Sequence, residues 1–221
     1  SPVVAVLHAA VLATTLFCIG GPVSLFWLSR YQAFAVAMLV VALVWSASVA
    51  ERRMRLAALV VAFGATIPVQ VAMTARAVDA TAEVRNGQFL TARLLEEWDP
   101  EAPVAVNDLG VVAWTHPGRV IDLWGLGSYE VLQARDGEPL TARDAERIVA
   151  AEGVEVVAIY EEWFTGGIPD SLTPVGALCL ADADVAGGAC VTYFAVDPAD
   201  AEPLRAALDG VADDLPPGTV H

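Results

Sequence analysis

The stretch VAVNDLGVVAWTHPGRVIDLWGLGSY, residues 104–129, contains two short apolar runs at 104–106 and 120–123. Each run is continuous, without polar residues in alternation, which is typical of strands buried on both faces of a parallel sheet. Between them, Leu109–Trp114 predicts a helical turn or short helix. A strand, a helical connection and a second strand indicate a βαβ crossover, and therefore an α/β fold.

The same alternation extends to both sides of this stretch. An amphipathic helix is predicted over Val78–Trp98, and a Thr141–Asp144 capping box predicts a helix to about Glu152, with Gly153 as its stop. Further strands are predicted at Val154–Tyr160, Val175–Leu180 and Val191–Val196, before a final helix that begins at Asp197-Pro198, reaches Leu208 and stops at Gly210. We expect residues 77–212 to form a small three-layer α/β domain with a mostly parallel sheet, and residues 213–221 to be a disordered tail.

The first third of the chain has a different composition. Three apolar stretches occupy residues 2–19, 33–50 and 56–75, and no acid lies inside any of them. Each has about the length needed to cross a hydrocarbon core of about 30 Å. The predicted fold class is therefore three transmembrane helices within residues 1–76, followed by the extracytoplasmic α/β domain. Buried helices of a soluble protein are the alternative.

Basic residues set the expected orientation. The segment Glu51-Arg52-Arg53-Met54-Arg55 separates the second and third stretches and predicts a cytoplasmic loop. The domain from residue 77 and the connection 20–32 would then lie outside the cytoplasm, in a multi-pass protein of the cell membrane. The connection contains Trp27, Arg30 and Tyr31, a composition typical of an interfacial segment. Arg30 is a candidate contact to a lipid phosphate, and simple anchoring at the headgroups is the alternative.

The charge is divided as unevenly as the hydrophobicity. The whole chain has a net charge of −15 and 56% hydrophobic residues. Five Arg and one acid up to residue 76 give +4, whereas seven Arg and 26 acids from residue 77 onward give −19. Such a surface repels phosphate backbones, so no nucleic-acid partner is expected.

Cysteine placement is consistent with an oxidising compartment. Cys179 and Cys190 lie on either side of the turn-rich segment ADADVAGGA and suit a disulfide that closes a β-hairpin. Metal binding is the weaker alternative, because no further Cys or His lies at ligand spacing near them. No metal site and no cofactor are expected.

Polar residues near the predicted strand ends are the candidates for chemistry. Asn107 and Asp108 follow the first strand, at the edge where α/β sheets place ligands. Asp122 lies in the next, apolar strand and needs partners, which Arg119 or the Asn107 amide could supply. Contact with substrate is one interpretation of these carboxylates, and turns and buried polar networks are the other.

Two acids follow the strand at Val154–Tyr160. Glu161 and Glu162 precede Trp163, a combination that can form a sugar subsite or a general acid/base pair. A solvated strand end is the alternative. His116 precedes Pro117-Gly118 and is expected to be exposed and inert. The glycines form neither a dinucleotide-binding nor a phosphate-binding loop, and spacing indicates no catalytic triad.

The order of these motifs resembles the C-terminal part of polytopic membrane glycosyltransferases of the C superfamily, relatives of dolichyl-phosphate-mannose and lipid A aminoarabinose transferases. The resemblance is carried by VAVNDLG (104–110), VIDLWGL (120–126) and VEVVAIYEEW (154–163). It implies transfer of a sugar from a polyprenyl-phosphate donor to an extracytoplasmic acceptor. In that family the catalytic acid lies in an outward loop near the N-terminus, so the resemblance implies an upstream transmembrane part and carries no catalytic residue onto this chain.

A function of another class remains open. The chain could be a non-enzymatic, membrane-anchored module whose outer domain binds a ligand or partner. A third hypothesis is a purely structural domain in which Asp108 and Asp122 only satisfy turns. Whether this chain contributes to an enzyme thus depends on what its candidate residues contact.

Overall fold

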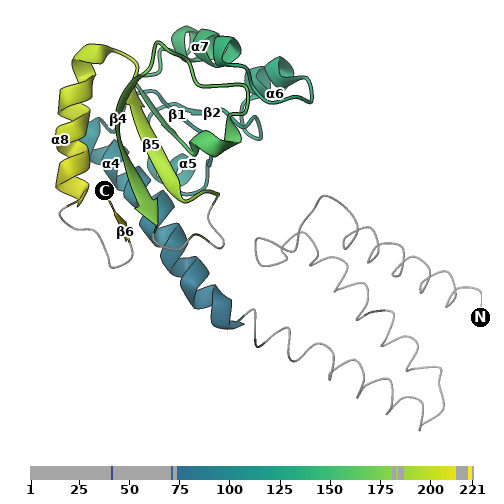
Figure 1. The fold of residues 1–221 in the computed structure, drawn as a ribbon, viewed down its shortest axis with the longest axis vertical. Helices are drawn as coiled ribbons and strands as arrows, with labels where there is room; N and C mark the ends of the chain where they lie inside the picture. Colours follow the sequence, from purple (N-terminus) through teal and green to yellow (C-terminus); the bar gives the residue numbers. More distant parts are fainter. Residues whose placement is uncertain are drawn as a thin grey trace, which may run out of the picture. The chain divides into compact units, whose positions relative to one another are not determined.

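The computed structural model describes residues 41, 71, 74–180, 183, 187–212 and 219–220. The chain divides into two compact units, Ser1–Ala80 and Thr81–His221. In the first unit, residues 74–80 are helical. The second unit contains the sheet, and Figure 1 shows its strands and helices.

The predicted fold class is wrong in its transmembrane part. No helix within the described ranges has both the length and the apolarity needed to cross a bilayer. α4 (Leu90–Trp98) and α8 (Ala201–Ala212) each carry several charged residues and therefore a polar face that favours water. The predicted spans 2–19, 33–50 and 56–75 lie outside the described residues, apart from positions 41, 71, 74 and 75.

The prediction of a mostly parallel sheet is also wrong. The described strands form one mixed sheet in the order β2-β1-β3-β5-β4-β6. Only β1–β2 and β1–β3 are parallel pairs, whereas β3–β5, β4–β5 and β4–β6 are antiparallel. The strands are β1 (Val104–Val106), β2 (Val120–Asp122), β3 (Val156–Ile159), β4 (Thr173–Leu180), β5 (Cys190–Ala195) and β6 (Thr219–Val220).

The sheet is mixed and not mostly parallel because of the connection that follows β3. A parallel neighbour needs a long crossover, usually helical, but the chain from residue 160 to 172 contains only the short η3 (Glu161–Trp163) before β4. β4 then turns back in a hairpin, and its second strand β5 inserts beside β3. β6 lies within the segment for which disorder was predicted.

Helices cover both faces of the sheet (Figure 1). On one face, α4 and α8 pack together over alternate residues of the strands, including Val104, Val156 and the fully buried Tyr193. On the other face, α6 (Tyr129–Arg135) and α7 (Ala142–Ala151) bury Val131 and Ile148. Both cores therefore lie within the second unit.

Local sequence signals explain α7 well. The Thr141 hydroxyl accepts a hydrogen bond from the Asp144 amide at 3.1 Å, which confirms the predicted N-cap. The same hydroxyl donates to the Asp144 carboxylate at 2.7 Å and lowers the pKa of that carboxyl. Gly153, at φ +64°, lies just after the helix as predicted. By contrast, Gly210 does not end the last helix, since α8 continues to Ala212.

The predicted helix over Val78–Trp98 is not uniform. A π-helix, η2 (Arg85–Phe89), precedes α4, with Asn86 and Gly87 buried. At Gly87 an added Cβ would lie 3.7 Å from the Tyr160 hydroxyl oxygen, so η2 approaches the end of β3 closely. A short π-helical segment inserted in an α-helix is often found at functional sites.

Candidate functional site

The carboxyl ends of β1, β2 and β3 meet at one edge of the sheet, because these three strands are parallel. Asn107 directly follows β1, Asp122 is the last residue of β2, and Tyr160 follows β3. This edge also lies beside η2, whose Gln88 reaches Asp108. Most of the candidate residues are therefore close to one another.

Asn107 ties two strand ends together. Its side chain is buried, its Nδ2 donates to the Tyr160 carbonyl at 3.2 Å, and its Oδ1 accepts from the Tyr160 amide at 3.1 Å. Both polar atoms of the amide are thus used by the backbone that follows β3. Asn107 has a structural role at this edge.

Asp122 organises the loop after β2. It is 1% exposed, and its carboxylate accepts from the backbone amides of Trp124 at 2.8 Å and Gly127 at 2.7 Å. Its own amide donates to the Ser128 hydroxyl at 2.8 Å, which satisfies a backbone group on an edge strand. The partners proposed for Asp122 are engaged elsewhere: Arg119 pairs with Glu152 at 2.5 Å, and Asn107 binds Tyr160.

Asp108 is held from η2. Gln88 Nε2 donates to the Asp108 carboxylate at 2.6 Å, and Gln88 Oε1 accepts from the Val111 amide at 3.3 Å. Gln88 and Asp108 line a cavity of about 10 Å³ together with Asn107 and Tyr160. That volume suits about one water molecule, so this cavity is too small for an organic ligand.

Tyr160 lies at the centre of the edge and is 3% exposed. Burial raises the pKa of its phenol, and the carboxylates of Asp108, Glu162 and Glu83 raise that pKa further. The phenol is therefore neutral at physiological pH and is not a base.

Three aromatic side chains gather beside this phenol, and we call Trp124, Tyr160 and Trp163 the aromatic cluster. The Trp124 and Trp163 rings meet edge to face at 4.8 Å between centroids, and Tyr160 and Trp163 lie 5.7 Å apart. Trp163 Nε1 donates to the Gly187 carbonyl at 2.7 Å. The Arg135 guanidinium lies 4.1 Å from the centre of the Trp124 ring, a cation–π contact.

Glu161 and Glu162 border the aromatic cluster. Both are exposed and lie in η3 with Trp163. At Gly188 an added Cβ would lie 2.1 Å from Glu162 Oε1, so the segment before β5 packs closely against Glu162. Together with Asp108, these residues place carboxylates beside aromatic rings at the carboxyl edge.

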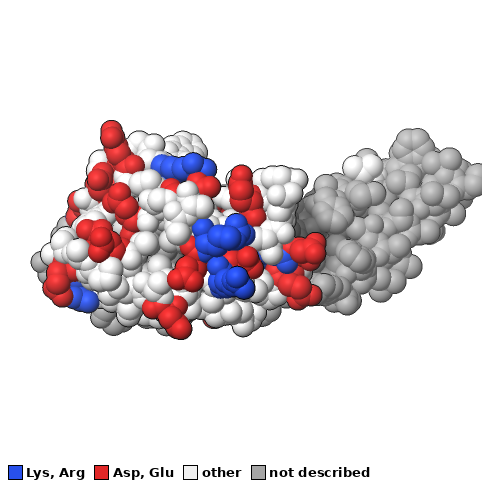
Figure 2. Space-filling model, turned by 90° about the horizontal axis from the view of Figure 1, so that it is seen from above, with Lys and Arg blue, Asp and Glu red and all other residues white. Residues whose placement is uncertain are grey.

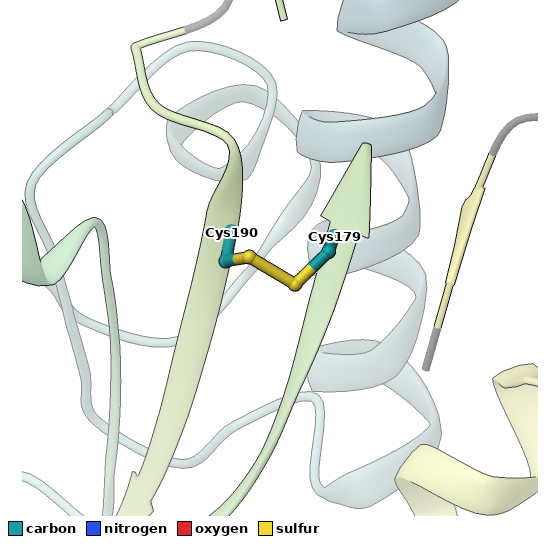
Figure 3. Close-up of a disulfide and its surroundings, with 2 residues drawn as sticks. All are labelled: Cys179 and Cys190. Atoms are coloured by element: carbon teal, nitrogen blue, oxygen red, sulfur yellow. A yellow bond between two sulfur atoms is a disulfide. The ribbon is translucent and has the colours of Figure 1, made fainter. Parts of the chain in front are cut away.

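The disulfide lies at the loop end of the β4–β5 hairpin, close to this edge. Cys179 at the end of β4 and Cys190 at the start of β5 are joined, as Figure 3 shows. The bond lies close in sequence to Gly187, which accepts from Trp163, and to Gly188, which packs against Glu162.

Histidine and metal chemistry receive no support from the described part of the chain. His116 is buried, contrary to prediction, with Nε2 at 2.7 Å from the Ala102 carbonyl. A side chain at residue 118 would obstruct this burial, since a Cβ added at Gly118 would lie 2.7 Å from both His116 Nε2 and the Ala102 carbonyl oxygen. Among the described residues, no group of three or more His, Cys, Asp or Glu could hold a metal ion.

One predicted site residue cannot be placed at this edge, and three residues that help to form the edge were not predicted. Arg30 and the connection 20–32 lie outside the described residues. Gln88, Trp124 and Tyr160 were not among the residues predicted from the sequence. An available signal was the position of two of them: Trp124 directly follows the strand predicted over 120–123, and Tyr160 is the last residue of the strand predicted over Val154–Tyr160.

The chain belongs to the family described as "Domain of unknown function (DUF8728)", whose model matches residues 74–196, more than half of the chain. The matched range includes η2, the parallel strands and the aromatic cluster. No curated protein and no solved structure matches the chain. The family assignment itself names no activity.

Proposed function

We propose that this chain is part of a glycosyltransferase that uses a polyprenyl-phosphate sugar donor at the outer face of a membrane, and that its α/β unit binds the sugar acceptor. The observation that carries the proposal is the aromatic cluster bordered by Asp108, Glu161 and Glu162. The resemblance of VAVNDLG and VIDLWGL to transferase motifs supports the same reaction class.

The chemistry of this edge suits a carbohydrate. Ring faces pack against the C–H surfaces of sugars, and carboxylates accept hydrogen bonds from hydroxyls, so a few polar groups beside apolar ones can orient such a ligand. Trp124 and Trp163 are partly exposed, and Glu161 and Glu162 are exposed, so these groups are accessible. They supply both kinds of contact.

The buried polar groups favour binding over catalysis here. Asn107 and Asp122 are used by backbone hydrogen bonds, and the Tyr160 phenol is held neutral. A general base for transfer would therefore come from another part of the protein. The Cys179–Cys190 disulfide supports an extracytoplasmic setting, since disulfides persist in oxidising compartments.

The first test is carbohydrate binding by the full chain on a glycan array. We expect the wild-type chain to bind at least one class of glycan. The binding signal should fall in the variant Glu162→Gln, a change at an exposed residue, and in the variant Trp163→Ala. Trp114→Ala is the matched control, because Trp114 is 90% exposed and lies on α5 (Val112–Thr115), not in the aromatic cluster. If no glycan depends on Glu162 or Trp163, acceptor binding at this edge is disproved.

The second candidate is a binding module without transfer activity, favoured by the structural use of Asn107 and Asp122. The two functions differ in their response to a radiolabelled polyprenyl-phosphate sugar. In membranes that contain the whole protein, a transferase would transfer the labelled sugar from the donor to a bound glycan. Glycan binding without label transfer would select the binding module.

A further inference from the structure

A second hollow lies along η2 and α4, away from the aromatic cluster. It is an open groove with a volume of about 510 Å³, within the range of small-molecule sites. We call it the α4 groove. It is lined by Arg85, Asn86, Phe89, Arg93, Glu96 and Thr115, with Leu90 and Ala92 beneath them.

The helix geometry explains which residues line the α4 groove. η2 buries Asn86 and Gly87, while Gln88 reaches the loop after β1. Arg85, Phe89 and Arg93 follow at spacings of four and lie on the groove side. The groove thus has a half-exposed aromatic ring, 52% accessible, between two guanidinium groups.

The charge of the α4 groove contrasts with its surroundings. Figure 2 shows acidic side chains spread over one face of the second unit, and the chain from residue 77 has 26 acids against seven Arg. Two of those seven Arg line this groove, with Glu96 as its single acid. Distant acids are screened beyond about 8 Å at physiological salt, so the charges in and beside the groove determine what binds there. These are Arg85 and Arg93, opposed by Glu96 and by Glu97, which pairs with Arg93.

The ion pair between Arg93 and Glu97 can open at little cost. Arg93 Nε lies 2.8 Å from Glu97 Oε1, but both side chains are more than 40% exposed. Exposed pairs of this kind contribute at most about 1 kcal/mol. Arg85 Nε donates to the Asn86 side chain at 3.1 Å, which holds its guanidinium beside the groove.

Apolar surface accompanies these cations. Phe89 forms the groove wall, and Thr115 on the facing helix is preceded by Trp114, which is 90% exposed. Exposed aromatic residues together with arginines are typical of segments at the headgroup level of a membrane. An amphipathic anion matches both features.

We propose that the α4 groove binds the phosphate of an anionic phospholipid headgroup at a membrane surface, with Arg85 and Arg93 on the phosphate and Phe89 against the acyl region. This site uses no residue of the aromatic cluster and does not depend on the proposed function. It would set the orientation of the second unit on the lipid surface.

The experiment uses the full chain and vesicles of equal parts phosphatidylglycerol and phosphatidylcholine. We expect the double variant Arg85→Gln/Arg93→Gln to lower vesicle affinity by about 30-fold, since each cation at an anionic surface contributes about a factor of five. Arg143→Gln/Arg147→Gln is the matched control: it removes the same charge from α7. Equal losses in the two variants would overturn the proposal.

Hydrogen exchange gives a readout that is specific to the groove. On the mixed vesicles, amides within 85–96 and 112–115 should become protected, and the protection should disappear in Arg85→Gln/Arg93→Gln. Protection that is equally strong on pure phosphatidylcholine would show that the phosphate charge is irrelevant and would refute the site. Inorganic phosphate alone giving the same protection would refute the lipid as its ligand.

Discussion

Asp122 shows how one buried carboxylate can shape a whole loop. Its two oxygens accept from the Trp124 and Gly127 amides, and the loop returns to Ser128, whose hydroxyl accepts from the Asp122 amide. Trp124 enters the aromatic cluster only because this loop is closed. Asp122 therefore acts on the candidate site through the backbone of this loop.

Replacing Asp122 by Asn should destabilise the fold. The new amide group would face a backbone N–H, leaving one buried donor unsatisfied at a cost of about 1–3 kcal/mol. Urea denaturation would measure the loss in the free energy of unfolding. Glu161→Gln serves as the control, because Glu161 is exposed, and a loss of equal size there would contradict this role for Asp122.

Tyr160 should make stability fall at alkaline pH. Burial raises the pKa of its phenol above the usual value, so the folded state holds the proton more tightly than the unfolded chain does. The stabilisation is complete below about pH 10 and is lost as pH rises toward the folded-state pKa, by about 1.4 kcal/mol per pH unit.

The measurement compares unfolding free energies of wild type and Tyr160→Phe across the alkaline range. Phe has no ionisable proton, so the variant should show a shallower decline. Tyr193, which is also buried with a raised pKa, remains in both proteins and gives a common background. Parallel declines in the two proteins would refute the role of Tyr160.

At the scale of elements, the β4–β5 hairpin joins the sheet to the candidate site. Its strands pair in register from Thr173↔Ala195 to Cys179↔Cys190, with one irregularity between Pro174 and Gly176. The disulfide closes the far end, where Gly187 receives the Trp163 indole N–H. The disulfide and the aromatic cluster are therefore coupled through the Gly187–Trp163 hydrogen bond.

Removing the disulfide should loosen this coupling. The cysteines are 11 residues apart, and opening a loop of that length should lower stability by about 3 kcal/mol through the entropy of the unfolded chain. Cys179→Ser/Cys190→Ser should also shift tryptophan fluorescence to the red, as Trp163 loses its partner. An unchanged spectrum in a folded, reduced protein would contradict the coupling.

Sequence patterns predicted most elements, the parallel pairing of β1 with β2 and the β4–β5 hairpin, but not the insertion of β5 beside β3. β1 was predicted with its exact bounds because a continuous apolar run between turn residues has one simple interpretation. The π-helix was missed because the amphipathic pattern of Val78–Trp98 contains no signal for a wider turn except Gly87. The antiparallel pairing of β5 depends on tertiary insertion beside β3, which no local pattern encodes.

The sequence indicated which strand ends to consider for the candidate site, but not the contacts made there. Asn107 and Asp108 were predicted just after a strand, at the edge where α/β sheets place ligands. Asp122 was predicted inside its strand, whereas the structure makes it the last residue of β2. Their partners are mainly backbone amides and Gln88, which have no residue signature at a distance. The aromatic cluster joins residues 124, 160 and 163, and only the folded sheet brings them together.

At the scale of the whole molecule, charge and packing oppose each other in the second unit. Two apolar cores, one on each face of the sheet, stabilise it, while a charge of −19 from residue 77 onward favours expansion. Several arginines are already paired with nearby acids, as in Arg119–Glu152 and Arg147–Asp144. The remaining repulsion acts between exposed carboxylates.

Salt should therefore stabilise this protein. Raising ionic strength from about 0.01 M to 0.15 M shortens the Debye length from about 30 Å to 8 Å and screens repulsion between carboxylates on separate elements. Salt also weakens the attractive ion pairs, but this loss of stability is smaller than the gain from screened repulsion, because exposed pairs contribute little. We expect the melting temperature to rise with sodium chloride, and more than it does for a variant in which Glu130, Glu138 and Glu146 are changed to Gln. A falling melting temperature would mean that attractive pairs dominate the electrostatics of the folded chain.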